Sequence, residues 1–197
     1  MLVLVHDELG LRERKKLATR QAIGDAALAL ALEHGPGAVT VDDIAAAADV
    51  SPRTFFNYFA TKEAAILGVD PQRRRDLLDR LAARPAGEPP LDALREALRG
   101  QDSAGAVAWR TRARLAHQHP QLQSAYIAGF TTLEAELTEA IAKRLEAPAG
   151  DAFPRLVVAI ALTAMRVAVD EAIDAGVDIA EAVEAAFAAV AAGMQVP

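Results

Sequence analysis

Helix-capping residues and helix breakers recur along this chain and divide it into helices of unequal length. Gly35-Pro36-Gly37 interrupts a helical pattern that begins near Leu11, because glycine and proline are the strongest helix breakers. Cap signals follow at Thr40, Ser51-Pro52 and Thr61, since serine and threonine are preferred N-caps and proline is preferred at the first helical position. The aliphatic residues fall at helical rather than alternating spacing, and alanine, the best helix former, is abundant. The sequence therefore predicts an all-α fold.

These signals predict ten helices and a loop after the fifth. The residues from 84 to 90 include three prolines and one glycine, so we expect a loop there. Asp70-Pro71 and Asp178 are read as the starts of later helices. The expected ranges are 11–34, 41–48, 52–59, a short helix capped by Thr61, 71–83, 91–99, 104–117, 120–146, 153–175 and 179–193.

Several functional classes are disfavoured by composition. The chain has no cysteine, which excludes disulfides, thiolate metal sites and a cysteine nucleophile. His117 and His119 are two residues apart and therefore point to different faces of a helix, so no metal site is expected. The sequence shows no glycine-rich phosphate loop, no HExxH and no G-x-S-x-G pattern, so neither a cofactor nor an enzymatic activity is expected. No apolar run is long enough to cross a bilayer, and Met1–Val5 is too short for a signal peptide, so the expected location is cytoplasmic.

The negative charge of the chain is unevenly distributed. The net charge is −6, but residues 1–62 hold nearly equal numbers of basic and acidic residues, and most of the excess lies in residues 63–197. Near the N-terminus lies a local basic cluster, formed by Arg12, Arg14, Lys15, Lys16 and Arg20. This asymmetry fits a protein in which one end meets phosphates while the rest stays solvated.

The segment from Thr40 to Lys62 combines a short helix, a tight turn and a second short helix. This geometry can place one helix in the major groove of DNA. Phe55 and Phe59 lie four residues apart on one face and should pack inward, whereas the remaining side chains point elsewhere. The outward-facing residues are Arg53, Thr54, Phe56 and Asn57. Four of the nine aromatic residues of the chain fall at positions 55–59, more than a small core needs.

The same segment resembles the DNA-binding half of the TetR family. The matching residues are Ile23, Ala26, Ala27, Leu30, Gly35, Thr40, Val41, Ile44, Ala45, Val50, Ser51, Thr54, Tyr58, Phe59, Lys62 and Glu63. Two departures concern the motif itself. Asp49 replaces the usual turn glycine, although aspartate tolerates left-handed geometry, and Phe56 stands where many members have tyrosine.

The resemblance implies a DNA-binding domain over residues 9–68 that reads a double-stranded operator. Arg53 is expected to contact a base, because a bidentate arginine–guanine pair discriminates bases by about 1–3 kcal/mol; Thr54, Phe56 and Asn57 are secondary candidates for base contacts. Phosphate contacts are expected from hydroxyls, helix N-termini and cations. The residues expected to make them are Thr40, Ser51, Thr54, Tyr58, Lys62, Arg14, Lys15 and Arg20.

Residues 69–195 correspond to the ligand-binding and dimerisation half of the family. By this resemblance, the helices over 153–175 and 179–193 would form a homodimer interface. Residues 81–94 and Phe153–Leu156 resemble an actinobacterial subgroup that includes mycofactocin-associated regulators, which implies an apolar or acyl-CoA-like effector. The candidate pocket residues are Trp109, Arg112, His117, Tyr126, Phe130, Met165 and Arg166.

The leading hypothesis is a dimeric, ligand-responsive repressor that binds a palindromic operator. Two alternatives come from other classes: a small helical enzyme, and a ligand-binding or scaffold protein without DNA recognition. Regulation by activation rather than repression also stays open, because the residues do not encode its sign.

Overall fold

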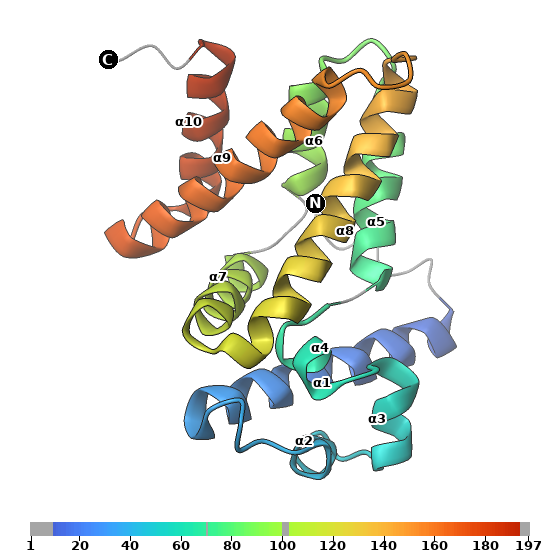
Figure 1. The fold of residues 1–197 in the computed structure, drawn as a ribbon, viewed down its shortest axis with the longest axis vertical. Coiled ribbons are helices and arrows are strands. Elements are labelled where there is room, and N and C mark those ends of the chain that lie inside the picture. The colour runs from blue at the N-terminus through green and yellow to red at the C-terminus, as the bar shows by residue number, and fades with distance from the viewer. Residues whose placement is uncertain (1–9, 70, 100–102, 194–197) are drawn as a thin grey trace. The chain divides into compact units, whose positions relative to one another are not determined.

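The protein is described here by a computed structural model covering residues 10–69, 71–99 and 103–193. Within these ranges the chain forms ten helices and no strand (Figure 1), so the all-α prediction is confirmed. The helices are α1 (Leu11–His34), α2 (Val41–Ala47), α3 (Pro52–Tyr58), α4 (Lys62–Ile66), α5 (Pro71–Ala82), α6 (Pro90–Leu98), α7 (Ser103–Gln118), α8 (Pro120–Arg144), α9 (Phe153–Ala175) and α10 (Ile179–Ala191). The expected cap at Asp70 lies outside the described residues.

Side-chain caps start the short helices at the expected residues. The Thr40 hydroxyl accepts the Asp43 N–H at 3.1 Å, while the Asp43 carboxylate accepts the Thr40 N–H at 2.9 Å. These reciprocal bonds form a capping box with aspartate in the place of the usual glutamate. Ser51 and Thr61 cap α3 and α4 in the simpler way.

Left-handed residues end four of the helices by one backbone motif. After α2, Asp49 has φ +52°, and the N–H of Val50 returns to the Ala45 carbonyl at 2.9 Å. This is the Schellman arrangement, which satisfies carbonyls that a helix end leaves without partners. Glu146 forms the same motif with φ +50°, which is why α8 ends at Arg144 rather than at 146; Gly68 and Gly176 end α4 and α9.

The chain forms two compact units. Among the described residues, the first consists of residues 10–69 together with 112–126, so it includes the second half of α7 and the first turns of α8. Its core is made by fully buried residues of α1 to α4 and by residues of the later segment. These core residues include Ile23, Ile44, Phe55, Ile66, Leu115 and Leu122.

The second unit consists, within the described part of the chain, of residues 71–99, 103–111 and 127–193. Helices α9 and α10 make its most extensive helix–helix contact, and its core includes Leu94, Leu137, Ile141, Val158 and Phe187. None of the helices in the described residues is long and apolar enough to span a membrane.

Candidate nucleic-acid interface

Helix α3 exposes the polar face that the sequence predicts. Phe55 is fully buried and Phe59 nearly so, and both belong to the core of the first unit. On the other side of the helix Arg53 and Asn57 are exposed, and Thr54 is half-buried. The two phenyl rings therefore hold α3 on the helices behind it and leave its polar side chains accessible to a partner.

Phe56 is the one aromatic ring of this segment that faces water. It is 58% exposed, and its ring meets Phe55 edge-on with 5.4 Å between ring centroids. A large exposed apolar side chain beside polar ones is more informative than an exposed aliphatic residue in a loop. Apolar contact with the methyl group of thymine is the base contact available to such a ring.

The hydroxyl groups predicted to contact phosphates already form helix caps. The Ser51 hydroxyl accepts the Thr54 N–H at 3.1 Å and lies 2.9 Å from the Thr54 hydroxyl. The Thr40 hydroxyl donates to the Asp43 carboxylate at 2.6 Å. The bonds from Thr40 hold the pKa of the Asp43 carboxyl below its ordinary value, so this group stays ionised next to the predicted phosphate contacts.

Lys62 binds the loop between α1 and α2. Its ammonium donates to the carbonyl of Pro36 at 3.1 Å and to that of Val39 at 2.7 Å. An ammonium has three donors, so one hydrogen remains for a phosphate. Lys62 therefore orders the segment that leads into α2, a role that its residue type and position in the sequence do not predict.

The basic cluster of α1 is divided between solvent and the α3 segment. Arg14 and Lys15 are exposed. Arg20 instead lies over two rings, 4.9 Å from the centroid of Phe59 and 5.8 Å from that of Tyr58, within the range of cation–π attraction. Arg12 belongs to α1, but its side chain lies outside the described part of the protein.

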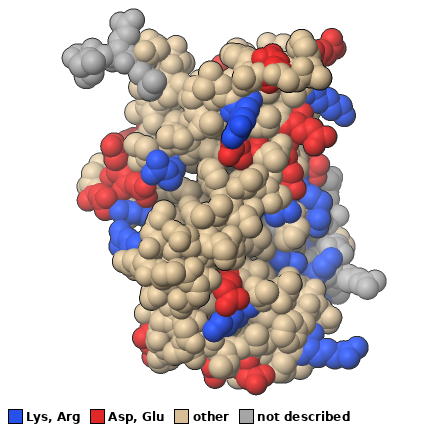
Figure 2. Space-filling model, viewed as in Figure 1, with Lys and Arg blue, Asp and Glu red and all other residues tan. Residues whose placement is uncertain are grey.

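Charge over the molecule is mixed rather than concentrated. Figure 2 shows basic and acidic side chains interspersed over the visible face. The affinity of a protein for DNA depends on the cations that meet phosphates rather than on the net charge. A net charge of −6 is therefore compatible with a local nucleic-acid interface at α3 and the start of α1.

The predicted pocket residues are divided between the two units. In the first unit, the ring of His117 lies 5.8 Å from that of Tyr126, and Arg112 is buried against α4. In the second unit, Trp109 and Met165 pack against the core, whereas Phe130 is 37% exposed. An Nη atom of Arg166 lies 3.7 Å from a carboxylate oxygen of Asp170.

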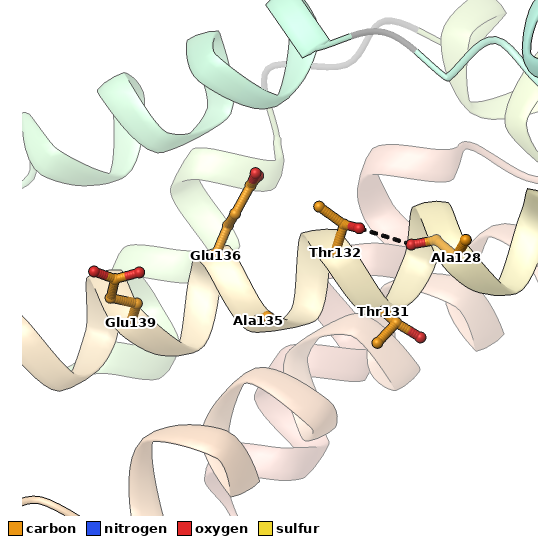
Figure 3. A pocket seen from close by; sticks show the side chains of 6 residues that line it. All are labelled: Ala128, Thr131, Thr132, Ala135, Glu136 and Glu139. Atoms are coloured by element: carbon orange, nitrogen blue, oxygen red, sulfur yellow. Dashed lines mark hydrogen bonds between the residues drawn. The ribbon is translucent and has the colours of Figure 1, made fainter.

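Two surface hollows occur in the second unit, and none of the seven predicted pocket residues lines either. One, of about 570 Å³, follows a single face of α8 from Ala128 to Glu139; Figure 3 shows its six lining residues on successive turns of that helix. The other, of about 650 Å³, lies between α5, the loop after it and α8. Its two arginines are engaged within the protein: Arg84 pairs with Glu88, and Arg144 donates to the carbonyls of Arg84, Pro85 and Glu88.

Comparison with known proteins identifies relatives for both halves of the chain. Residues 23–67 match the family model described as bacterial regulatory proteins, tetR family, and residues 88–195 match the model described as MftR C-terminal domain. The transcriptional regulator TcmR of Streptomyces glaucescens is 37% identical over 164 residues, 77% of this chain and 71% of that protein.

Two further similarities extend over nearly the whole chain. MftR of Mycobacterium tuberculosis, named for transcriptional regulation of mycofactocin biosynthesis, is 30% identical over 185 residues, 92% of this chain and 93% of that protein. The solved structure of GusR from Salmonella enterica superposes with a TM-score of 0.56 at 22% identity, covering 90% of this chain and 93% of that one. At this identity the superposition shows a shared fold.

Proposed function

Because this chain belongs to the TetR family of bacterial regulatory proteins and is a DNA-binding transcriptional regulator, we propose that it is a ligand-responsive repressor that binds a palindromic operator as a homodimer. The match of its C-terminal half confirms the resemblance to the subgroup that includes mycofactocin-associated regulators. Its expected place of action is the cytoplasm, where a bacterial chromosome is found.

The observation that carries the DNA-binding proposal is the exposed face of α3. Arg53 and Asn57 are exposed and Phe56 is 58% exposed, while Phe55 behind them is fully buried. Side chains read bases only when they can enter a groove and reach base edges. We propose that Arg53 reads guanine, that Thr54, Phe56 and Asn57 complete base recognition, and that Arg14, Lys15, Ser51, Tyr58 and the third donor of Lys62 hold phosphates.

The homodimer proposal is supported by an apolar stripe along α9. Phe153, Leu156, Ile160 and Val167 share one face of the helix, on which Thr163 is the polar member between the last two. Phe153 is 51% exposed and Leu156 is 56% exposed, and contiguous apolar surface of this kind marks an interaction site. A second copy is the occupant that a palindromic operator requires, because a two-fold dimer presents two reading helices to two half-sites.

The effector proposal concerns the second unit. We infer an apolar or acyl-CoA-like small molecule, bound near Trp109, Phe130 and Met165, because this part of the chain matches the MftR C-terminal domain and because these side chains are only partly buried. Such a ligand releases DNA only if it binds one conformation of the dimer better than the other. We further propose that the protein binds and releases the effector without changing it chemically, as expected of a regulator rather than an enzyme.

Two experiments test the proposal. The full chain selects duplexes from a random-sequence pool, and footprinting then locates its site in the region upstream of its own gene. The expected result is a palindromic protected site whose half-sites lie about one helical turn, roughly 34–36 Å, apart. A medium-chain acyl-CoA serves as the first effector probe and should reduce protection and be recovered intact. Equal affinity for selected and scrambled duplexes at physiological salt would contradict DNA recognition, whereas turnover of the probe would favour the enzyme alternative.

A further inference from the structure

Arg112 is a buried charged residue of the first unit and lies on α7, away from the exposed face of α3. Only 8% of its surface is exposed. Removing a charged group from water costs several kcal/mol unless partners replace the lost hydration. The partners of Arg112 therefore indicate what this residue is placed to hold.

The first partner is the C-terminal end of α4. The Schellman bonds at Gly68 and Val69 satisfy the carbonyls of Ala65 and Ala64, respectively. The next carbonyl, that of Ile66, accepts the Nε–H of Arg112 at 3.2 Å. Arg112 thus extends the cap of α4, and its positive charge lies at the helix end that favours cations.

The second partner is α1. An Nη atom of Arg112 lies 3.8 Å from the Asp25 carboxylate. A Cβ atom at Gly24 would have three neighbours at about 4 Å: an Nη atom of Arg112, the Phe59 ring and the Ala65 carbonyl. Gly24 of α1 is therefore the point at which three groups meet: the Arg112 guanidinium, the C-terminal part of α4 and the Phe59 ring that follows α3.

Gly68 makes this close approach possible. Its φ is +62°, and a Cβ there would lie 2.9 Å from Nε and 3.0 Å from Cζ of Arg112. A side chain at this position would be strained by the backbone conformation and would displace the guanidinium. Gly68 therefore leaves the room that the guanidinium from α7 occupies, and Gly24 of α1 lies beside it at ordinary contact distance.

We propose that Arg112 is a positioning residue for DNA recognition, which joins the second half of α7 to α4 and α1 and thereby sets where Phe59 holds the recognition helix α3. This inference rests on the proposed function, because it assumes that α3 reads DNA. It differs from the pocket role expected from the sequence, since the guanidinium is buried against the DNA-binding helices. Arg112 adds a polar link to the apolar contacts that Leu115 and Ala116 of the same α7 segment make in the core that contains Phe55 and Phe59.

The test compares Arg112→Met, Arg112→Lys and the matched control Arg114→Met, an exposed arginine two residues further along α7. Affinities for the duplex selected by the wild-type chain and for a scrambled duplex are measured at a temperature at which circular dichroism shows all variants folded. Arg112→Met should weaken binding to the selected duplex about tenfold, the loss of roughly one base contact. Binding to the scrambled duplex and the salt dependence of binding should change little, because Arg112 touches no phosphate.

Arg112→Lys should be intermediate, because an ammonium can still donate to Ile66 but cannot also reach Asp25, and Arg114→Met should behave as wild type. If Arg112→Met does not fold, the intermediate specificity of Arg112→Lys carries the test. An unchanged ratio of selected to scrambled affinity in the folded Arg112 variants would overturn the inference. Failure of the wild-type chain to prefer any duplex would instead overturn the proposed function.

Discussion

Neighbouring residues of α3 have opposite environments although their chemistry is similar. Phe55 and Phe56 are adjacent, yet the first is fully buried and the second is 58% exposed, because successive residues of a helix point about 100° apart. Burying a phenyl ring stabilises the fold by roughly 1.5–3 kcal/mol. The exposed ring contributes little of this, so its value to the protein is expected to lie in a contact with a partner.

Arg53 has the exposed position that direct base contact requires. Replacing Arg53 by Ala should relax preference at one base pair per half-site, because a bidentate arginine–guanine contact contributes about 1–3 kcal/mol of discrimination. Gel-shift titrations on the selected duplex and on its single-base variants measure this effect. Lys15→Ala is the matched control, an exposed cation whose loss should weaken all duplexes alike and reduce the salt slope. Undiminished discrimination at every base pair in Arg53→Ala would refute the assignment.

Asp43 makes the stability of the capping box depend on pH. Its carboxyl pKa is lowered, first by the hydrogen bond from the Thr40 hydroxyl and then by the one from the Thr40 N–H. A carboxyl whose pKa is lower in the folded state stabilises the fold fully above its unfolded pKa, about 3.9, and loses this contribution as pH falls through the folded value.

The difference in melting temperature between wild type and Asp43→Asn should therefore be largest near neutral pH and should shrink below about pH 4. Thermal melts followed by circular dichroism from pH 2.5 to 7 measure it. Asp42→Asn, one residue earlier and outside this pair of bonds, is the control and should show a smaller change. A constant difference across the whole range would show that the capping bonds do not depend on ionisation.

At the scale of elements, α2 and α3 are too short to be stable alone. Each has seven residues, fewer than the roughly 12–15 that an isolated helix needs in water. They depend on caps at their ends and on one buried face each, supplied by Ile44 and Phe55. The turn between them is closed by Asp49 in the left-handed conformation.

Ser51→Ala should lower the free energy of unfolding by about 1 kcal/mol, because it leaves the Thr54 N–H without its cap. Chemical denaturation monitored by far-ultraviolet circular dichroism measures the change. Ser124→Ala, an exposed serine on α8, controls for loss of a hydroxyl and should leave stability within about 0.5 kcal/mol of wild type. Equal stability of the two variants would mean that packing alone maintains α3.

At the scale of the whole molecule, the proposed repressor requires two chains. Leu156→Glu places a charge in the apolar stripe of α9 and should convert the dimer to a monomer, because an unpaired charge buried in an interface costs several kcal/mol. Multi-angle light scattering measures the mass of the variant in solution. Its affinity for the operator should fall together with the loss of the dimer. Leu32→Glu is the matched control, since Leu32 is equally exposed at 56% but lies on α1 in the first unit. A dimer that persists in Leu156→Glu would place the interface elsewhere.

Local chemistry accounts for most of what the sequence predicted correctly. Thr40, Ser51, Thr61 and Asp178 cap helices at the expected residues, because a cap acts within three residues of itself. Phe55 and Phe59 are buried as their spacing predicts. The end of α8 was two residues off, since nothing in the sequence marks Glu146 as a left-handed residue.

Contacts between distant residues could not be predicted in this way. Lys62 binds carbonyls 23 and 26 residues away, and Arg112 reaches Ile66 across 46 residues. Residue type and family resemblance predicted a phosphate as the partner of Lys62 and a ligand as the partner of Arg112. Their burial and partners depend on which helices pack together.

By itself, the sequence determined where the capped helices begin and which residues of α3 face outward, because capping and helical periodicity act over a few residues. Only the tertiary structure decided that residues 112–126 join the first unit and that the Arg112 guanidinium packs against Gly68. The physical reason is that burial of a charge is determined by all of its neighbours together, and these neighbours are brought together only by folding.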